Sequence, residues 1–174
     1  LVWPRDLVEA AGGLLAAGAG SDALRVLDYL QVTQEEDGHW QQNMWLDGSP
    51  YWKGIQMDET AFPIVLLDML FREGVLDKAA LQRYLGMAGK AVAYLVSNGP
   101  SSQQDRWEEN GGYSPFTLAV EIIALLAAAA MFEGNGEAAM ARYLYETADT
   151  WNDNIEAWTY VKDTDLAKQL GIEG

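Results

Sequence analysis

The chain has 174 residues, of which 49% are hydrophobic and 21% charged, a composition typical of a folded domain rather than a disordered chain. Eleven Lys and Arg stand against 26 Asp and Glu, and the formal net charge of −15 argues against a nucleic-acid or anionic-membrane partner. With no Cys and one His, the composition excludes disulfides and Cys-ligated zinc and argues against a Ser-His-Asp triad or a multi-His metal site.

Apolar residues recur at helical spacing along most of the chain, and this pattern predicts an all-α fold. The expected helices cover 7–17, 21 to the Asp37-Gly38 break, 59–72, 77–96, 116–133 and 137–160. Ser21, Asp58 and Asp77 are the expected N-caps.

Two long polar loops interrupt the predicted helices. Residues 38–57 form the first loop, with a short hairpin around Asp47-Gly48, and residues 101–115 form the second. Short turns follow the first, third and fifth helices instead. A stack of helical hairpins therefore gathers both loops and the N-terminal Trp-Pro-Arg-Asp segment at one end, at helix N-termini.

The polar segments recur about every 50 residues, at Asp6, Asp58 and Glu108, which indicates an internal repeat of helical hairpins. Three hairpins make an open arc, about half of a closed toroid, with the first, third and fifth helices on its inner side. The chain starts with an interior-looking segment, so we expect residues 1–174 to be part of a longer polypeptide. The apolar run 122–131 is shorter than the ~20 residues that a membrane span needs, so no membrane partner is expected.

The segment 105–113 holds the highest concentration of candidate catalytic side chains. Glu108 and Glu109 are adjacent carboxylates beside Trp107, in a loop with two glycines. Neighbouring carboxylates and an apolar ring raise a carboxyl pKa, which is what a general acid requires. Taken alone, such a pair is also typical of a solvated acidic turn.

Two further segments can address sugar hydroxyls. Arg5 and Asp6 lie beside Trp3 and can donate and accept hydrogen bonds to vicinal hydroxyls. The alternative is an N-capping Asp6 with a solvated Arg5. For the segment 52–59 the alternative is an N-capping Asp58 followed by a capping-type Glu.

Most tryptophans belong to these polar segments: Trp3, Trp40, Trp45, Trp52 and Trp107. Exposed Trp rings among Asp, Glu, Arg, Asn and Gln are typical of a carbohydrate-binding cleft, because Trp stacks on the apolar face of a pyranose. Trp151 and Trp158 lie at helical spacing and are expected in the core, and His39 is expected to be structural.

Four segments in this order resemble the family 15 glycoside hydrolases, which comprise glucoamylases and glucodextranases with an (α/α)6 toroid. They are VWPRD, WKGIQMDETAFP from Trp52 to Pro63, RWEENGGYSPFT from Arg106 to Thr117, and WNDNIEAWTY from Trp151 to Tyr160. The bacterial branch is the most similar, with glucodextranase nearest. The resemblance spans essentially the whole chain and implies part of a catalytic domain.

The resemblance implies roles residue by residue. Glu108 looks like the general acid, Glu109 like a binder of substrate hydroxyls, and Asp105 like an acidic residue that tunes the site. Arg5 and Asp6 resemble the pair that grips the terminal glucose.

Aromatic and polar residues of the same resemblance complete the pocket. Trp3 and Trp52 look like its walls, with Trp107 as a further stacking ring. Gln56 and Asp58 match positions near an aromatic loop. An Arg expected two residues after Trp52 is Gly54 here, so contacts beyond the terminal glucose, and hence linkage preference, stay open.

The resemblance implies an exo-acting, inverting enzyme that releases β-glucose from the non-reducing ends of α-glucans of the dextran or starch type. Its general base lies downstream in the family, so this chain alone is expected to be inactive and to self-associate through open helix faces. No cofactor and no metal ligand are expected. Calcium in the complete enzyme stays open, since no Asp-x-Asp-x-Asp-Gly loop is present. Secretion from a bacterium is the expected localisation.

Two other functions fit the same motifs. A non-catalytic carbohydrate-binding module of helical hairpins would keep the Trp residues without needing an acid at Glu108. A trehalase-type α/α-toroid hydrolase would use the same motifs on another substrate.

Overall fold

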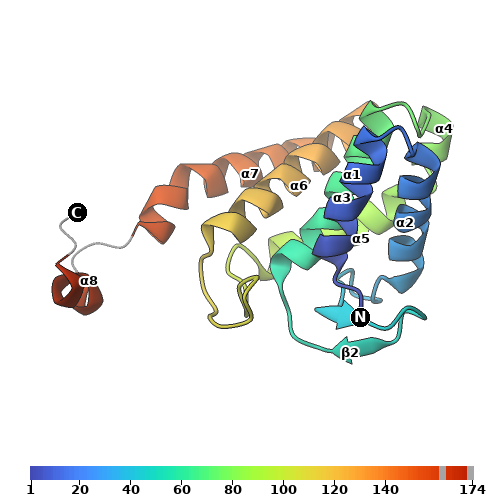
Figure 1. Cartoon of the computed structure of the whole chain (residues 1–174). Helices are drawn as coiled ribbons and strands as arrows, with labels where there is room; N and C mark the ends of the chain where they lie inside the picture. Colours follow the sequence, from blue (N-terminus) through green and yellow to red (C-terminus); the bar gives the residue numbers. More distant parts are fainter. Residues whose placement is uncertain (161–163, 172–174) are drawn as a thin grey trace.

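The computed structural model describes residues 1–160 and 164–171, which form an all-α arrangement with one small hairpin (Figure 1). Its helices are α1 (Pro4–Ala16), α2 (Gly20–Thr33), α3 (Met57–Arg72), α4 (Lys78–Leu81), α5 (Leu85–Asn98), α6 (Pro115–Gly134), α7 (Ala138–Thr159) and α8 (Asp165–Leu170). Strands β1 (Asn43–Met44) and β2 (Pro50–Trp52) pair antiparallel. The predicted all-α class and the hairpin around Asp47-Gly48 are confirmed.

The helices pack as hairpins in two layers. Helix α3 packs between α1 and α6, and these three form one row. On this row, α2 packs against α1 and α3, α5 against α3 and α6, and α7 against α6. The row of α1, α3 and α6 is the inner set that the sequence predicts.

The polar segments meet at one end of this arrangement. Figure 1 shows the N-terminus, the β-hairpin and the loop between α5 and α6 at the lower end of the helices. The short connections from α1 to α2 and from α6 to α7 lie at the opposite end. The predicted gathering of loops at helix N-termini is therefore confirmed.

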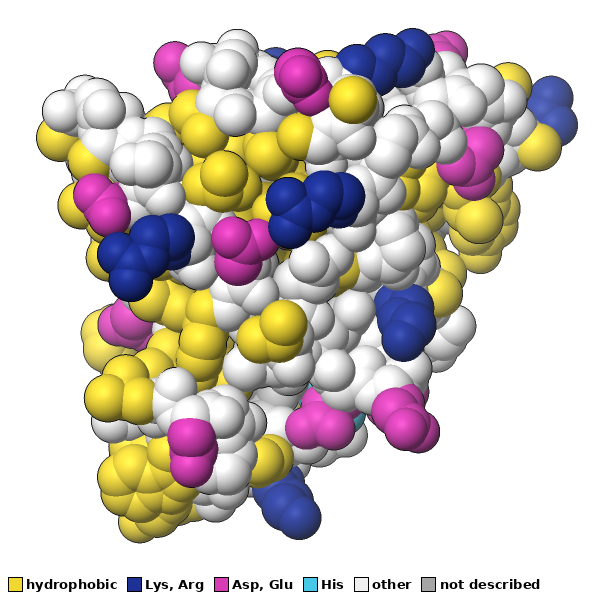
Figure 2. Space-filling model, turned by 90° about the vertical axis from the view of Figure 1, so that its right-hand side faces the viewer, with side chains coloured by type: hydrophobic (Ala, Val, Ile, Leu, Met, Phe, Trp, Pro, Cys, Tyr) yellow, Lys and Arg dark blue, Asp and Glu magenta, His cyan; other side chains and the backbone are white. Residues whose placement is uncertain are grey.

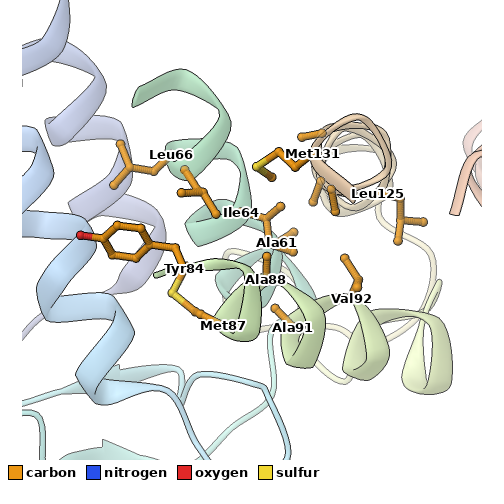
Figure 3. Close-up of a cluster of buried hydrophobic side chains, with 14 of the residues drawn as sticks. Ala61, Ile64, Leu66, Tyr84, Met87, Ala88, Ala91, Val92, Leu125 and Met131 are labelled. Carbon is orange, nitrogen blue, oxygen red and sulfur yellow. The ribbon is translucent and has the colours of Figure 1, made fainter. Parts of the chain in front are cut away.

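Small residues allow the central helices to approach closely. In Figure 3, Ala61 and Ile64 of α3 face Ala88 and Val92 of α5, with Leu125 of α6 beside them. Each of these side chains is at most 1% exposed. The mixture of Ala with larger aliphatic residues lets the packed layers interdigitate closely.

Helix α6 is the most apolar element. Its composition and 20-residue length suffice for a membrane span, with a mean hydropathy of 2.1 over its most apolar 18 residues. However, 67% of that window is buried inside the structure. Packing against α3, α5 and α7 therefore accounts for its composition.

Two predicted helix starts are wrong. Helix α2 begins at Gly20 and has no side-chain cap, so Ser21 is not an N-cap. Helix α3 begins at Met57 after Gln56, which places Asp58 inside the first turn instead of at the cap. The Asp77 cap is confirmed, because its carboxylate accepts a hydrogen bond from the Ala80 N–H.

The single helix predicted over 77–96 is also wrong, since α4 and α5 are separated at residues 82–84. Tyr84 lies fully buried at this break, and its hydroxyl donates to Asp28 Oδ1 in α2 at 2.6 Å. Tertiary packing of one aromatic side chain thus overrides helix propensity here. With α4 and α8 added, the described residues hold eight helices where six were predicted.

The surface carries charges of both signs. Figure 2 views the structure from the right-hand side of Figure 1, and it shows Lys and Arg side chains scattered among Asp, Glu and apolar patches. This face does not present the concentrated basic surface that phosphate binding requires.

Candidate functional site

Arg5 joins the first turn of α1 to the first turn of α3. Its Nη1 donates to Asp58 Oδ2 at 2.6 Å and to Gln56 Oε1 at 3.0 Å. The Glu59 carboxylate lies 3.3 Å from the same nitrogen and also accepts the Arg5 backbone N–H. Arg5 is therefore a largely buried cation held by α3 rather than a solvated residue beside a cap.

The neighbouring Asp6 has a different environment. Its side chain is 68% exposed, and its Oδ2 lies 3.7 Å from Arg5 Nε. The pair thus presents one anchored guanidinium and one open carboxylate next to each other, an arrangement suited to vicinal hydroxyls.

Three carboxyl groups are fully buried at the same end of the helices as Arg5 and Asp6. Asp58, Glu59 and Glu121 are each 0% exposed. Burial raises the pKa of Asp58 and of Glu59, with Arg5 acting in the opposite direction on both. Burial, reinforced by the Asp58 charge, raises the pKa of Glu121 to about 8.

The loop between α5 and α6 is closed by a backbone pair between Ser102 and Gly112, whose N–H groups each donate to the other's carbonyl oxygen. Asp105 shapes the loop from inside. Its Oδ1 accepts the backbone N–H groups of Trp107 at 3.0 Å and Glu109 at 3.1 Å. The structure thus gives Asp105 a loop-forming part in addition to the predicted tuning of the site.

Glu108 lies at the tip of this loop with a positive φ of 64°. It is a non-glycine residue in the left-handed region, which costs free energy and is frequent at functional sites. Its side chain is half-buried, and its carboxylate forms no hydrogen bond or ion pair with a residue that the structure describes. Glu109 is exposed beside it.

Aromatic rings border both loops. Trp52 on β2 is 46% exposed and lies 5.5 Å, centroid to centroid, from Tyr51. Trp107 is 68% exposed, and the Arg106 guanidinium lies 4.8 Å from its ring centroid. Trp3 is half-buried immediately before α1. Three predicted stacking rings therefore belong to this end of the molecule.

One hydrogen bond attaches the Glu108 loop to the start of α3, the helix that holds Arg5. Ser102 Oγ accepts the Met57 backbone N–H at 3.1 Å, which joins the loop to the first residue of α3. Arg106 lowers the pKa of Asp58, a smaller effect than the burial that raises it. The loop and the Arg5 cluster thus lie at the same end of the molecule and are joined at the start of α3.

Gly54 stands where the resemblance implies an Arg. A Cβ at this position would displace the side-chain oxygens of Gln42 and Gln104, which are the ends of flexible side chains. These two carboxamides, from the two polar loops, fill the space that a side chain at position 54 would need.

Trp40 was predicted to be an exposed ring of the cleft, and this prediction is wrong. The other loop tryptophans are at least partly exposed. Trp40 is 0% exposed, and its Nε1 donates to the Leu30 carbonyl at 2.9 Å. Trp151 is confirmed in the core at 7% exposure. Trp158 is half-buried and stacks on Tyr113 with ring centroids 5.0 Å apart, so it supports the Glu108 loop.

His39 is structural, as predicted. Its Nδ1 lies 2.5 Å from Asp37 Oδ1, and its ring stacks on Tyr94. Among the described residues, no group of three or more His, Asp or Glu is arranged to hold a metal ion.

Sequence reasoning missed Glu121 and Arg106. A single carboxyl in the otherwise apolar run of α6 was the available signal for Glu121. Arg106 lies over both Trp107 and Phe116, whose centroids are 4.8 and 4.7 Å away. A cation two residues before the paired carboxylates was the signal in that case.

Comparison with known proteins places this geometry in a family. A family model described as glycosyl hydrolases family 15 matches residues 34–169. A glucoamylase of Clostridium sp. (strain G0005) is 40% identical over 162 residues, 93% of this chain and 22% of that protein. An uncharacterized glycosyl hydrolase of Methanocaldococcus jannaschii is 28% identical over 132 residues, 75% of this chain and 21% of that protein.

A solved structure agrees with the sequence relatives. The crystal structure of a bacterial glucoamylase complexed with acarbose matches with a TM-score of 0.81 and 39% identity, over 90% of this chain and 22% of that one. The fold is therefore part of an α/α toroid. The chain spans between a fifth and a quarter of the length of these relatives.

Proposed function

We propose that this chain, which belongs to glycosyl hydrolase family 15, is part of an exo-acting, inverting hydrolase that releases β-glucose from the non-reducing ends of α-glucans. The observation that carries the proposal is the attachment of the Glu108 loop to the start of α3, next to the buried Arg5–Asp58 pair. The glucoamylase relatives support the substrate class, and one of them is complexed with acarbose.

Arg5, Asp6 and Glu109 hold the terminal glucose in this proposal. The fixed Arg5 guanidinium donates to ring hydroxyls, and the open Asp6 carboxylate accepts from them. Gln56 and Asp58 act through Arg5, because both bind its Nη1. Trp3, Trp52 and Trp107 supply the stacking surfaces.

Glu108 is the proposed general acid. Its proton passes to the glycosidic oxygen as the bond between that oxygen and C1 breaks, so the leaving sugar departs as a neutral alcohol. A second carboxylate takes a proton from water while the water oxygen attacks C1 from the opposite face. In inverting enzymes the two carboxyl groups lie about 6.5–9.5 Å apart. We place this base in the part of the relatives' length that the present chain does not span.

Product analysis with the complete protein tests the proposal. Starch, dextran and trehalose are offered separately, and the first product is followed by proton NMR, which separates α- from β-glucose. We expect β-glucose as the initial product from starch or dextran. Hydrolysis of trehalose alone would support the trehalase-type alternative, and binding of α-glucan without any glucose would support a carbohydrate-binding module.

A further inference from the structure

Glu121 is a buried carboxyl to which the proposed mechanism assigns no part. It lies in α6 at 0% exposure, and neither of its oxygens has a hydrogen-bond partner among the described residues. Gly99 and Trp151 lie close to it, since a Cβ at Gly99 would be 2.7 Å from Glu121 Oε1 and 2.9 Å from Trp151 Cη2. The lack of a side chain at Gly99 thus leaves room for this carboxyl.

The charges around Glu121 are unbalanced. Asp58 of α3 acts on Glu121 through its charge, and the single cation Arg5 of α1 is shared between Asp58 and Glu59. Arg106 acts on Asp58 from the loop before α6. Gly99 and Trp151, its neighbours after α5 and in α7, carry no charge.

An ionised Glu121 would therefore be a buried charge without a partner, an unfavourable state that protonation avoids. A neutral carboxyl carries one O–H that needs an acceptor. Asp58 Oδ1 is a buried acceptor without a partner, while Oδ2 of the same carboxylate holds Arg5. One hydrogen bond between the two groups would give a partner to the Glu121 O–H and to Asp58 Oδ1.

We propose that Glu121 is a positioning residue for the sugar-binding Arg5: as a neutral acid it donates a hydrogen bond to Asp58 Oδ1, directly or through one buried water. This bond fixes the Asp58 carboxylate and thereby the guanidinium that meets the terminal glucose. The inference rests on the proposed function of Arg5.

The pKa of Glu121, raised to about 8 by burial and by the Asp58 charge, supports a neutral acid at pH 7. Above about pH 8 the proton is lost, and two adjacent carboxylates then repel one another. Arg5 is less well fixed in that state, so the affinity for substrate falls at alkaline pH.

Kinetics of the complete protein on a soluble α-glucan test the inference between about pH 5 and about pH 9. In the wild type, KM rises as pH passes about 8. Glu121→Leu removes the donor and raises KM about tenfold at pH 6, with a smaller change in kcat. Glu121→Gln keeps an N–H donor that does not titrate, so it restores KM and abolishes the alkaline rise. Glu133→Gln, an exposed carboxyl of the same helix, is the control and follows the wild type.

Two results would overturn the inference: an unchanged KM in Glu121→Leu, or an alkaline rise of KM in Glu121→Gln equal to that of the wild type. If Glu121→Leu does not fold, the pH profile of Glu121→Gln decides alone. If the complete protein hydrolyses no α-glucan, the proposed function fails, but Glu121 is still tested by carbon-13 NMR. A carboxyl that titrates near 4.5 would then refute the neutral acid.

Discussion

Arg5 is the cation that pairs with the buried carboxyl groups of Asp58 and Glu59 at the site end of the helices. Replacing it with Met leaves Asp58 and Glu59 buried beside each other without their cation. We predict that Arg5→Met lowers the free energy of unfolding by about 3–5 kcal/mol, because a buried pair is broken from one side. Denaturant unfolding measures the loss.

Arg25 provides the matched control for this experiment. Its side chain is 82% exposed and lies 3.5 Å from Asp22, one turn away in α2. Arg25→Met should change the free energy of unfolding by no more than about 0.5 kcal/mol. Equal losses in both variants would contradict the assigned burial of Arg5.

The raised pKa of Glu121 makes stability depend on pH. Between the ordinary value of 4.5 and about 8, the folded protein holds a proton that the unfolded chain releases. The free energy of unfolding therefore falls as pH rises through this window, by at most about 1.4 kcal/mol per pH unit, and this contribution is flat outside it.

Glu121→Gln isolates this contribution from those of Asp58 and Glu59, whose raised pKa values act in the same direction. We predict that the variant gains stability relative to the wild type as pH rises from about 4.5 to about 8. Thermal unfolding at a series of pH values measures the difference. A difference that does not vary with pH would count against the neutral Glu121.

Single residues show what the sequence could and could not reveal. The Arg5 and Glu108 segments are contiguous motifs, and their residue types indicated sugar chemistry once they were combined with the loop tryptophans. Glu121 required knowledge of which face of α6 is buried and what lies across it. Trp40 was misjudged for a related reason, since its indole N–H finds the Leu30 carbonyl only after the loop has folded onto α2.

At the scale of elements, the junction between α5 and the Glu108 loop depends on a glycine. A Cβ at Gly99 would lie within 3.0 Å of the Leu95 carbonyl oxygen, Glu121 and Trp151. We predict that Gly99→Ala lowers the free energy of unfolding by about 1–3 kcal/mol through overpacking.

Gly86 offers the opposite case at the other end of α5. It is exposed in the helix, and a Cβ there meets no atom within 4 Å. Gly86→Ala should raise the free energy of unfolding by about 0.5–1 kcal/mol, because Ala loses less backbone entropy in a helix. Both variants are compared by denaturant unfolding, and stabilisation by Gly99→Ala would show that the junction has more room than the structure gives it.

The helices were largely predictable because apolar periodicity and breakers are local signals. Asp77, for example, caps α4 through a bond three residues away. The break between α4 and α5 was not predictable, since it depends on the contact of Tyr84 with Asp28 in another helix. Asp58 was likewise not predictable from local signals, since its carboxylate binds Arg5 of α1 and lies inside the first turn of α3.

For the molecule as a whole, the arrangement of the loops carries the functional argument. Three hairpins with short turns at one end necessarily bring their long loops together at the other, and Figure 1 shows this arrangement. The sequence therefore predicted which segments meet. It did not predict how they are joined, because the bond between Ser102 and Met57 and the packing around Gly54 exist only in three dimensions.

The most direct test of the account is the turnover of the complete protein on an α-glucan with and without the Glu108 carboxylic acid. We predict that Glu108→Gln lowers kcat about 10²–10⁴-fold while KM stays close to that of the wild type, since an amide cannot donate the required proton. Glu133→Gln, an exposed carboxyl at the other end of α6, should retain wild-type turnover. A Glu108→Gln variant with unchanged kcat would contradict the assignment of the general acid.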